Sequence, residues 1–275
     1  MNRPKIVAHC QVKNEELWVW YAIMSVLEYV DEILVWDTGS TDQTVEIVKS
    51  IRDPKVKYKQ AQETPDETTL SMVRTQMIQA SKEFDWMLIL DGDEIWLEKS
   101  LKQVVEFLAQ SGTNFDGIVT PTLNCVGDVF HVLPADAGKY HLLGKVGHFN
   151  IRFINLTIPG LHVANPPGKL LSYLDKDNHH LYDSPRLTYL NAPYLHTTHL
   201  ARTADRRKET SVFWRAFKKK YELGLRLPHD FKYPKCFYVS RPAIVRSPFV
   251  KRDLGFLISS ALQTPLRKIK RQILK

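Results

Sequence analysis

Three carboxylates stand together in the run Asp91-Gly-Asp93-Glu94, which directly follows the apolar residues 86–90. An apolar run of this length predicts a buried strand, and open α/β sheets bind their ligands at the carboxyl ends of such strands. Carboxylates this close repel one another, and a hard divalent cation that carries a phosphorylated ligand would neutralise them. Because Asp and Gly are also common in turns, an ordinary solvated surface turn is the alternative. The motif on its own leaves both interpretations open.

Strand and helix patterns alternate along the first 90 residues. Short apolar runs predict strands at residues 6–10, 33–36, 56–58 and 86–90. Apolar residues at helical spacing, preceded by capping residues, predict helices within residues 14–28, 41–51 and 70–78. This alternation predicts an α/β fold with a mostly parallel, Rossmann-like central sheet that is flanked by helices and joined by right-handed crossovers.

The pattern is weaker in the rest of the chain. The expected elements there are a helix at 101–108, a strand at 115–121 and weaker strands at 149–154 and 187–190. Beyond residue 200 we expect a cation-rich helix at about 205–223 and a terminal helix with Thr264 as its cap and Pro265 as its first residue. Since no repeat is present, we predict one catalytic-sized domain, 1–200, and a basic, largely helical C-terminal extension, 201–275.

The charge of the chain is unevenly distributed. The 275 residues carry a net charge of +8, yet residues 1–100 hold 11 Lys+Arg against 18 Asp+Glu. Residues 101–200 hold 7 against 7, and residues 201–275 hold 20 against 5. A tail this basic suits nucleic acid, an anionic membrane surface or a phosphorylated substrate.

Two further features bear on the cell compartment. No apolar run approaches the roughly 18–20 residues that span a bilayer, and the first residues lack the apolar stretch of a signal peptide. Cys10, Cys125 and Cys236 are widely separated and lack metal-ligand spacing, which favours reduced thiols. We therefore expect a cytoplasmic protein.

Polar or acidic residues follow three of the predicted strands. They are the segment after Cys10, Asp37, and the pair Asp91 and Asp93. In a parallel sheet these carboxyl ends lie at one edge, so three weak signals become one cleft. A nucleotide needs such a cleft, with acceptors for its base and ribose and a cation for its phosphates.

The residues of this cleft resemble a known enzyme family. The matching segments are Asn14-Glu15-Glu16, residues 30–45 with Asp37-Thr-Gly-Ser-Thr-Asp42, residues 73–76 and residues 88–94. In this order they resemble the inverting family 2 glycosyltransferases, over roughly the first 100 residues. The resemblance implies the nucleotide-sugar-binding GT-A fold for residues 1–200 and transfer of a sugar from a nucleotide-diphosphate donor to a glycan or lipid-linked acceptor.

The resemblance also assigns roles to single residues. It implies that Asp37 contacts the nucleobase, that Asp91 lies near the ribose and the metal, and that Asp93 binds Mn²⁺ or Mg²⁺. For Asp37 the alternative is a helix-capping acid beside a turn. Arg74 is expected to reach the donor diphosphate or to pair with an acid, with a surface helical arginine as the alternative. Many relatives carry a metal-binding histidine in the region of His196 and His199, and we prefer His196.

The general base is less well defined. Related enzymes often have Gly-x-His-Glu where this chain has Gly160-Leu-His162-Val163, so valine replaces a glutamate of the acid-base machinery. An inverting displacement still needs a carboxylate near the acceptor hydroxyl. The candidates are Glu94, Asp128, Asp175, Asp177 and Asp183. We name Asp183, with a cap before Ser184-Pro185 as its alternative role, and we expect Trp96 either to stack on a sugar or to pack beneath the site.

The C-terminal segment has an amphipathic pattern. Leu254, Leu257, Ile258, Ala261 and Leu262 recur at helical spacing, and cations crowd the end up to Lys275. Such a helix suits peripheral attachment to the inner face of an anionic membrane, and a C-terminal helix packed on the domain is the alternative. For the whole chain, the other functions considered are a nucleic-acid-binding protein that uses the tail and another metal-dependent nucleotide or phosphate enzyme on a Rossmann-like sheet.

Overall fold

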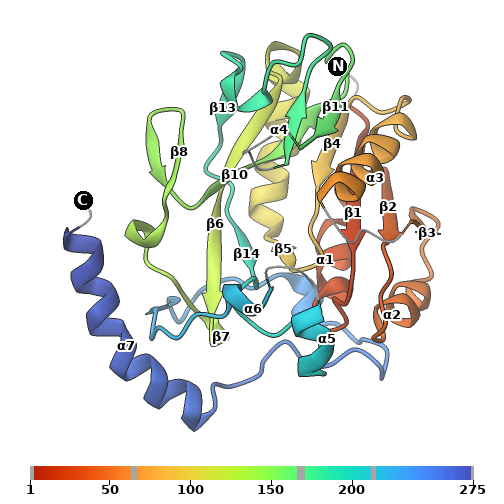
Figure 1. Ribbon diagram of the computed structural model, residues 1–275. Coiled ribbons are helices and arrows are strands. Elements are labelled where there is room, and N and C mark those ends of the chain that lie inside the picture. Colours follow the sequence, from red (N-terminus) through yellow and green to blue (C-terminus); the bar gives the residue numbers. More distant parts are fainter. Residues whose placement is uncertain (1–2, 63–66, 166–170, 212–214, 274–275) are drawn as a thin grey trace.

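The protein is built around one large, mostly parallel sheet (Figure 1). The computed structural model describes residues 3–62, 67–165, 171–211 and 215–273. Four parallel strands form the first half of the sheet: β1 (Ile6–Val12), β2 (Glu32–Asp37), β3 (Val56–Gln60) and β4 (Trp86–Ile89). They confirm the four strands predicted in this half.

The second half of the sheet is added through one reversed strand. β10 (Phe149–Asn155) pairs antiparallel with both β4 and β6 (Gly117–Val126), so β6 points the same way as β4. The remaining strands of this sheet are β5 (Glu94–Trp96), β7 (Asp128–Val132), β13 (Leu187–Tyr189), β14 (Tyr194–His196) and β15 (Leu225–Arg226). Two small hairpins lie outside it: β8 (Tyr140–Leu142) with β9 (Lys145–Gly147), and β11 (His162–Ala164) with β12 (Ser172–Leu174).

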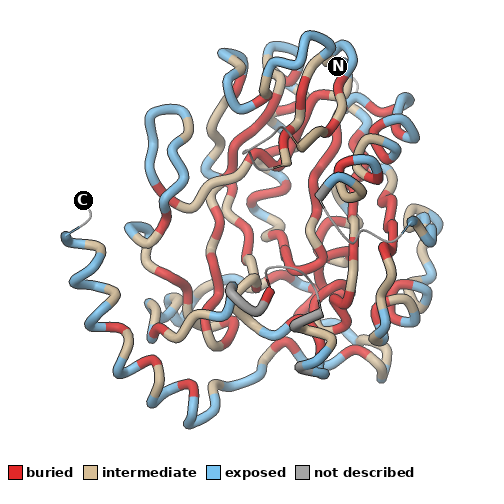
Figure 2. The backbone as a smooth tube through the Cα atoms, in the orientation of Figure 1, coloured by how far each residue is buried: buried red, intermediate tan, exposed pale blue. Residues whose placement is uncertain are grey.

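Helices cover both faces of the sheet. The larger core contains side chains of α1 (Val19–Val26), α2 (Thr44–Ser50) and α4 (Glu98–Ser111). The smaller core contains Val73 and Met77 of α3 (Glu67–Gln79). Alternate residues of β1 enter different cores, with Ile6 and Ala8 in one and Val7 in the other, as a strand buried on both faces requires. Figure 2 shows this burial concentrated along the central strands. The fold confirms the predicted α/β class.

The C-terminal region differs from its prediction in two places. The helix expected at about 205–223 is confirmed in α5 (Arg206–Ser211) and α6 (Arg215–Lys218), but its predicted end is wrong, because the chain is not helical after Lys218. There the Leu223 N–H donates to Thr264 Oγ1 at 2.9 Å, and Glu222 pairs with Arg271, so the segment lies along the terminal helix.

The terminal helix α7 (Leu254–Ile273) also begins eleven residues before Pro265, the first residue predicted for it. Asp253 Oδ1 accepts a hydrogen bond from the Phe256 N–H at 2.6 Å and starts the helix. Pro265 therefore lies inside the helix, and the Thr264 hydroxyl donates to the Ser260 carbonyl instead of capping. Among the described residues, no helix is long and apolar enough to cross a membrane.

Candidate active site

The acidic turn and His196 are brought together by strand register. β5 follows the turn and pairs antiparallel with β14, which places His196 opposite Glu94. His196 Nε2 lies 3.3 Å from Asp93 Oδ2 and 3.9 Å from Glu94 Oε1. The Thr197 N–H then donates to the Asp93 carbonyl at 2.9 Å, which fixes the turn against the end of β14. Two of the three predicted metal ligands are thus in contact.

Asp93 is a buried anion. Its side chain is 1% exposed, and its Oδ2 lies 3.1 Å from an Arg202 guanidinium nitrogen. Burial alone would raise the pKa of Asp93, but Arg202 and His196 hold that pKa well below its usual range. Oδ2 has no hydrogen bond of good geometry despite its burial. This oxygen therefore carries negative charge but accepts no well-formed hydrogen bond.

Asp91 is the more open member of the pair. Its side chain is 32% exposed and lies between Arg74, at 3.4 Å, and Arg152, at 3.3 Å. Burial opposes ionisation, but the two arginines lower the pKa of Asp91 below its usual value. Arg74 also donates to Gln11 Oε1 at 3.2 Å. Arg74 is therefore part of the acidic cluster and not a solvated arginine of a helix surface.

Arg152 was not among the predicted site residues. It is 7% exposed, forms an ion pair with the fully buried Glu94, and donates through Nε to Tyr194 Oη at 2.8 Å. Burial raises the pKa of Glu94 well above its usual range, and Arg152 opposes that shift. The signal in the sequence was a single arginine inside the apolar run 151–154, since a buried arginine needs an acid partner.

A second buried cluster supports the turn from below. Arg202 and Arg215 both pair with Glu15, and Arg202 also reaches Asp93. A Cβ atom on Gly92 would lie 2.8 Å from Glu15 Cγ, so the residue between the two aspartates has to be glycine for Glu15 to fit. Sequence reasoning placed Glu15 in the right motif but did not assign it these partners.

Asp37 ends β2 at the same edge of the sheet. It pairs in register with Val12 of β1 and is 1% exposed. Its carboxylate accepts hydrogen bonds from the Gly39 and Ser40 N–H groups and from Gln60 Nε2, the last at 2.9 Å. Gly39 has φ 97°, which favours glycine in this turn. Asp37 thus organises the turn that precedes α2, and Gln60 lies beside it at the predicted base end of the cleft.

The other sequence candidates lie elsewhere. Trp96 is fully buried and stacks on Tyr194 with 4.7 Å between ring centroids, so it packs beneath the site. His199 Nδ1 lies 2.6 Å from the Lys218 carbonyl oxygen. Among the residues that the structure describes, Asp183 forms no hydrogen bond or ion pair with Asp91, Asp93 or His196. It precedes β13, whose Leu187 pairs with Gly117 at the amino end of β6, so it lies toward the opposite edge.

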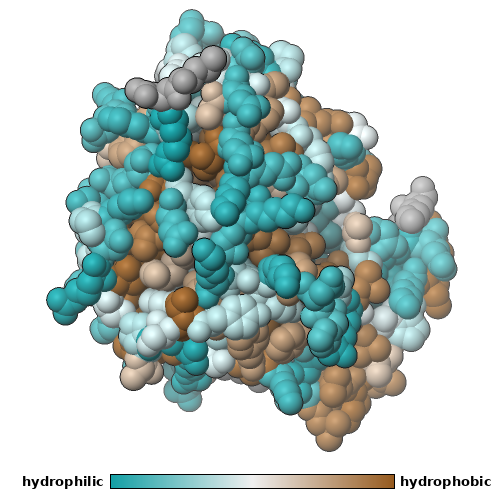
Figure 3. Space-filling model, turned by 180° about the vertical axis from the view of Figure 1, so that it is seen from behind, coloured by the Kyte–Doolittle hydropathy of each residue, from teal (hydrophilic) through white to brown (hydrophobic). Residues whose placement is uncertain are grey.

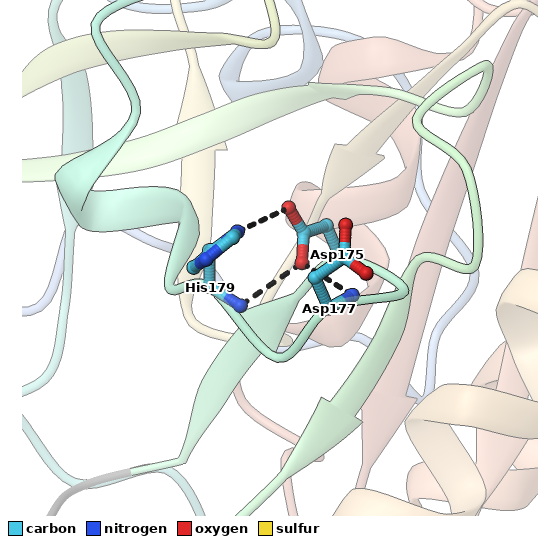
Figure 4. A group of neighbouring side chains, drawn as sticks. All are labelled: Asp175, Asp177 and His179. Atoms are coloured by element: carbon cyan, nitrogen blue, oxygen red, sulfur yellow. Dashed lines mark hydrogen bonds and ion pairs between the residues drawn. The ribbon is translucent and has the colours of Figure 1, made fainter.

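Asp175 and Asp177 form a separate surface cluster with His179 (Figure 4). Asp175 Oδ1 accepts from the N–H groups of Asp177 and His179, both at 2.9 Å, and Oδ2 lies 3.2 Å from His179 Nδ1. These contacts close a loop between β12 and β13. In the described part of the chain, these are the three acidic or histidine side chains whose possible metal-ligand atoms all lie within 4.8 Å of one another.

The acidic turn nevertheless fits a divalent cation chemically. Asp93 Oδ2 is a buried anionic oxygen beside an imidazole nitrogen, and Asp91 is the exposed carboxylate next to it. Oxygen ligands with one imidazole suit Mn²⁺ well and Mg²⁺ less well. These carboxylates form ion pairs with three arginines, Arg74, Arg152 and Arg202. The arginines also give the cleft the positive charge that a diphosphate needs.

Solved structures with a similar fold were found. S. aureus TarS 1-349 matches with a TM-score of 0.50 and 17% identity, over 70% of this chain and 60% of that one. Mycobacterium tuberculosis glucosyl-3-phosphoglycerate synthase, in complex with phosphoglyceric acid, matches with a TM-score of 0.45 and 17% identity, over 70% and 72%. The mannosyltransferase PcManGT from Pyrobaculum calidifontis, in complex with GDP-Man and Mn²⁺, matches with a TM-score of 0.40 and 16% identity, over 56% and 45%.

A comparison with curated proteins gives no match. The protein-family comparison does: the model described as Glycosyl transferase family 2 matches residues 11–157, more than half of the 275-residue chain. The matched span contains Asp37, Arg74, Asp91, Asp93 and Arg152. The chain belongs to glycosyl transferase family 2.

Proposed function

We propose that this protein transfers a sugar from a nucleoside-diphosphate donor to a hydroxyl group of a glycan or lipid-linked acceptor, with a divalent cation and with inversion. The observation that carries the proposal is the contact of Asp93 with His196 at the carboxyl edge of the sheet, inside a fold of this family. The proposal also places the enzyme at an anionic membrane surface, where a lipid-linked acceptor would lie.

The donor would lie across the ends of four neighbouring strands, β3, β2, β1 and β4. Asp37 and Gln60 at the ends of β2 and β3 would face the nucleobase, and Asp91 and Arg74 would face the ribose and diphosphate. β2, β1 and β4 are adjacent, so the ends of β2 and β4 are about 10 Å apart at the usual strand spacing. An extended nucleoside diphosphate can span such a distance, so each end can meet its own residues.

Asp91, Asp93 and His196 would hold the cation. When bound, it supplies positive charge to the diphosphate as the sugar departs. The protein contributes fixed charge of its own, because Arg74 and Arg152 already lie beside Asp91 and would face the donor phosphates. Asp93 itself is buried, so its own interactions are stronger than they would be in water.

The base that activates the acceptor is a choice between two carboxylates. Asp183 was predicted, but it lies toward the amino edge of β6. Asp128 follows β6 at the carboxyl edge and lines a cavity of about 470 Å³ together with His199 and Trp18. It pairs with His131 at 2.7 Å and with Arg252 at 3.3 Å, which would orient the carboxylate. Its position at the edge that carries Asp93 favours Asp128.

The proposed function is tested by a screen of nucleoside diphosphates and nucleotide sugars, with and without Mn²⁺. The measured quantity is the thermal unfolding temperature of the protein with each compound. We expect one nucleotide to raise the unfolding temperature in a metal-dependent way. With the donor known, product formation is compared for Asp128→Asn and Asp183→Asn. Loss in the first variant only supports Asp128, and loss in the second only restores Asp183. A protein that no nucleotide stabilises is not the enzyme we propose.

A further inference from the structure

Helix α7 presents the opposite polarity from an ordinary packed helix. Its 20 residues make a helix about 30 Å long. Figure 1 shows this helix at the outside of the molecule. The side that faces the protein carries Phe256, Ser260 and Thr264, and these are the buried residues of the helix. Phe256 packs near Val126 and Leu133, and Thr264 accepts a hydrogen bond from the Leu223 N–H, so this side joins one apolar contact to one polar contact.

The end of the helix is held by charge. Arg271 donates to both carboxylate oxygens of Glu222, at 2.6 and 2.5 Å, and Glu222 is only 2% exposed. Leu223 is tied to Thr264 through its backbone N–H. These contacts fix which side of the helix faces inward.

The outward side of α7 is apolar. Six large aliphatic side chains on it are between 53% and 75% exposed: Leu254, Ile258, Leu262, Leu266, Ile269 and Ile273. Their spacing of four, four, four, three and four residues keeps them on one face. Figure 3 shows hydrophobic side chains gathered on the lower part of this helix. A continuous exposed apolar face of this kind on a folded protein marks a surface that a membrane or another molecule covers.

The charges around this face identify what covers it. Residues 254–273 contain Arg267, Lys268, Lys270 and Arg271 but no acidic residue. At about 100° per residue, Lys268 and Lys270 fall on opposite borders of the apolar face. Both are exposed, as is Lys251 just before the helix, whereas Lys275 lies outside the described residues. Two such helices from separate copies would bring like charges together, while anionic headgroups would complement them.

We propose that α7 lies on an anionic lipid bilayer, with its apolar face in the headgroup and acyl boundary and its polar face holding the catalytic domain. Phe256 touches the region of Gly127, at the carboxyl end of β6, so the helix starts beside the edge that carries Asp93 and His196. That edge would lie near the membrane. This consequence rests on the proposed function, because it matters only if the acceptor is linked to lipid.

The test is flotation of the full chain with phosphatidylcholine vesicles that contain or lack phosphatidylglycerol. We expect binding to the anionic vesicles only, weakened at least ten-fold by the double substitution Leu262→Gln with Leu266→Gln. Val146→Gln with Leu225→Gln removes two apolar side chains elsewhere that are also more than half exposed, and it should leave binding unchanged. Lys268→Gln and Lys270→Gln should each weaken binding about five-fold, and the loss should shrink at high salt.

Three outcomes overturn the inference: no flotation of the parent chain, flotation unaffected by the Leu262 and Leu266 changes, or a lipid-free dimer that those changes split. The last, seen by light scattering, would assign α7 to a second copy instead. The assay uses neither donor nor acceptor, so its failure leaves the transfer reaction standing. Metal-dependent stabilisation by nucleotide, measured on the same variants, shows separately whether the catalytic domain is intact.

Discussion

His196 Nε2 and Asp93 Oδ2 lie 3.3 Å apart although their residues are separated by more than one hundred positions in the chain. The contact follows from two pairings of β14, antiparallel to β5 and parallel to β6. β5 begins at the end of the acidic turn and pairs antiparallel with β14. The last residue of β14 therefore lies next to that turn. The site is therefore assembled by the second half of the sheet as much as by the first.

Replacing Asp93 should remove the metal response of the protein. Asp93→Asn keeps the shape of the side chain but removes the anionic oxygen beside His196. We expect thermal stabilisation by Mn²⁺ with a nucleoside diphosphate to be lost and kcat to fall by about 100- to 1,000-fold. Asp175→Asn is the matched control, because Asp175 belongs to the other cluster of possible ligands. If the control loses the response and Asp93→Asn keeps it, the metal site has been assigned to the wrong cluster.

The buried pair of Arg152 and Glu94 should be costly to break. Arg152→Met leaves Glu94 buried without its cation, so we expect unfolding in urea to require about 3–5 kcal/mol less free energy. Adding Glu94→Gln removes the stranded carboxyl group and should recover part of the loss. A double-mutant cycle measures this coupling. Equal losses for the single and double variants would mean that Arg152 acts through its contact with Tyr194 and not through Glu94.

The first half of the fold was predictable because its signals are local. β1, β2 and β4 are apolar runs that end in polar turns, and parallel pairing alone puts Asp37 and Asp91 at one edge. Arg152, Arg202 and Arg215 were not predictable in the same way, since each meets its acid partner across 58 to 200 positions. The helix at 205–223 ends early for a related reason: beyond Lys218 the chain is held by α7, through the ion pair of Glu222 with Arg271 and the hydrogen bond from the Leu223 N–H to Thr264.

The orientation of α7 shows the limit of an amphipathic pattern. The spacing of Leu254, Ile258 and Leu262 predicts a helix with one apolar face, and that helix exists. The pattern does not say whether the apolar face turns inward. Here the polar contacts of Thr264 and Arg271 decide it, and their partners lie in a segment that the sequence predicted as helix.

Acid should destabilise the protein partly through His9. Burial lowers the pKa of His9 from 6.5 to about 3, with a smaller effect from Arg74, while its ring accepts or donates at Ser81 Oγ across 2.8 Å. Below pH 6.5 His9 is protonated in the unfolded chain but stays neutral in the folded chain. The stability that neutral His9 contributes is therefore fully present above pH 6.5 and is lost as the pH falls toward 3. Between pH 6.5 and pH 5 the loss should be about 2 kcal/mol.

This pH effect is measured by urea unfolding at several pH values. His9→Gln retains a group that can bond Ser81 and cannot titrate, so its stability should fall less steeply between pH 6.5 and pH 5. His179→Gln makes the same change at a side chain that is 77% exposed and should keep the slope of the parent chain. Identical slopes for the parent and His9→Gln would show that His9 is not the residue responsible.

The two histidines after β14 should differ in their effect on metal preference. His196 faces Asp93, whereas His199 Nδ1 faces the Lys218 carbonyl, and burial together with Lys220 lowers the pKa of His199 to about 3. His196→Gln replaces an imidazole nitrogen by an amide. This change should weaken the binding of Mn²⁺ more than the binding of Mg²⁺, because imidazole is a better ligand for Mn²⁺ than for Mg²⁺. Thermal unfolding with each ion and a nucleoside diphosphate measures the ratio of the two affinities. His199→Gln should leave that ratio unchanged, and a shift of the ratio in His199→Gln alone would move the third ligand to His199.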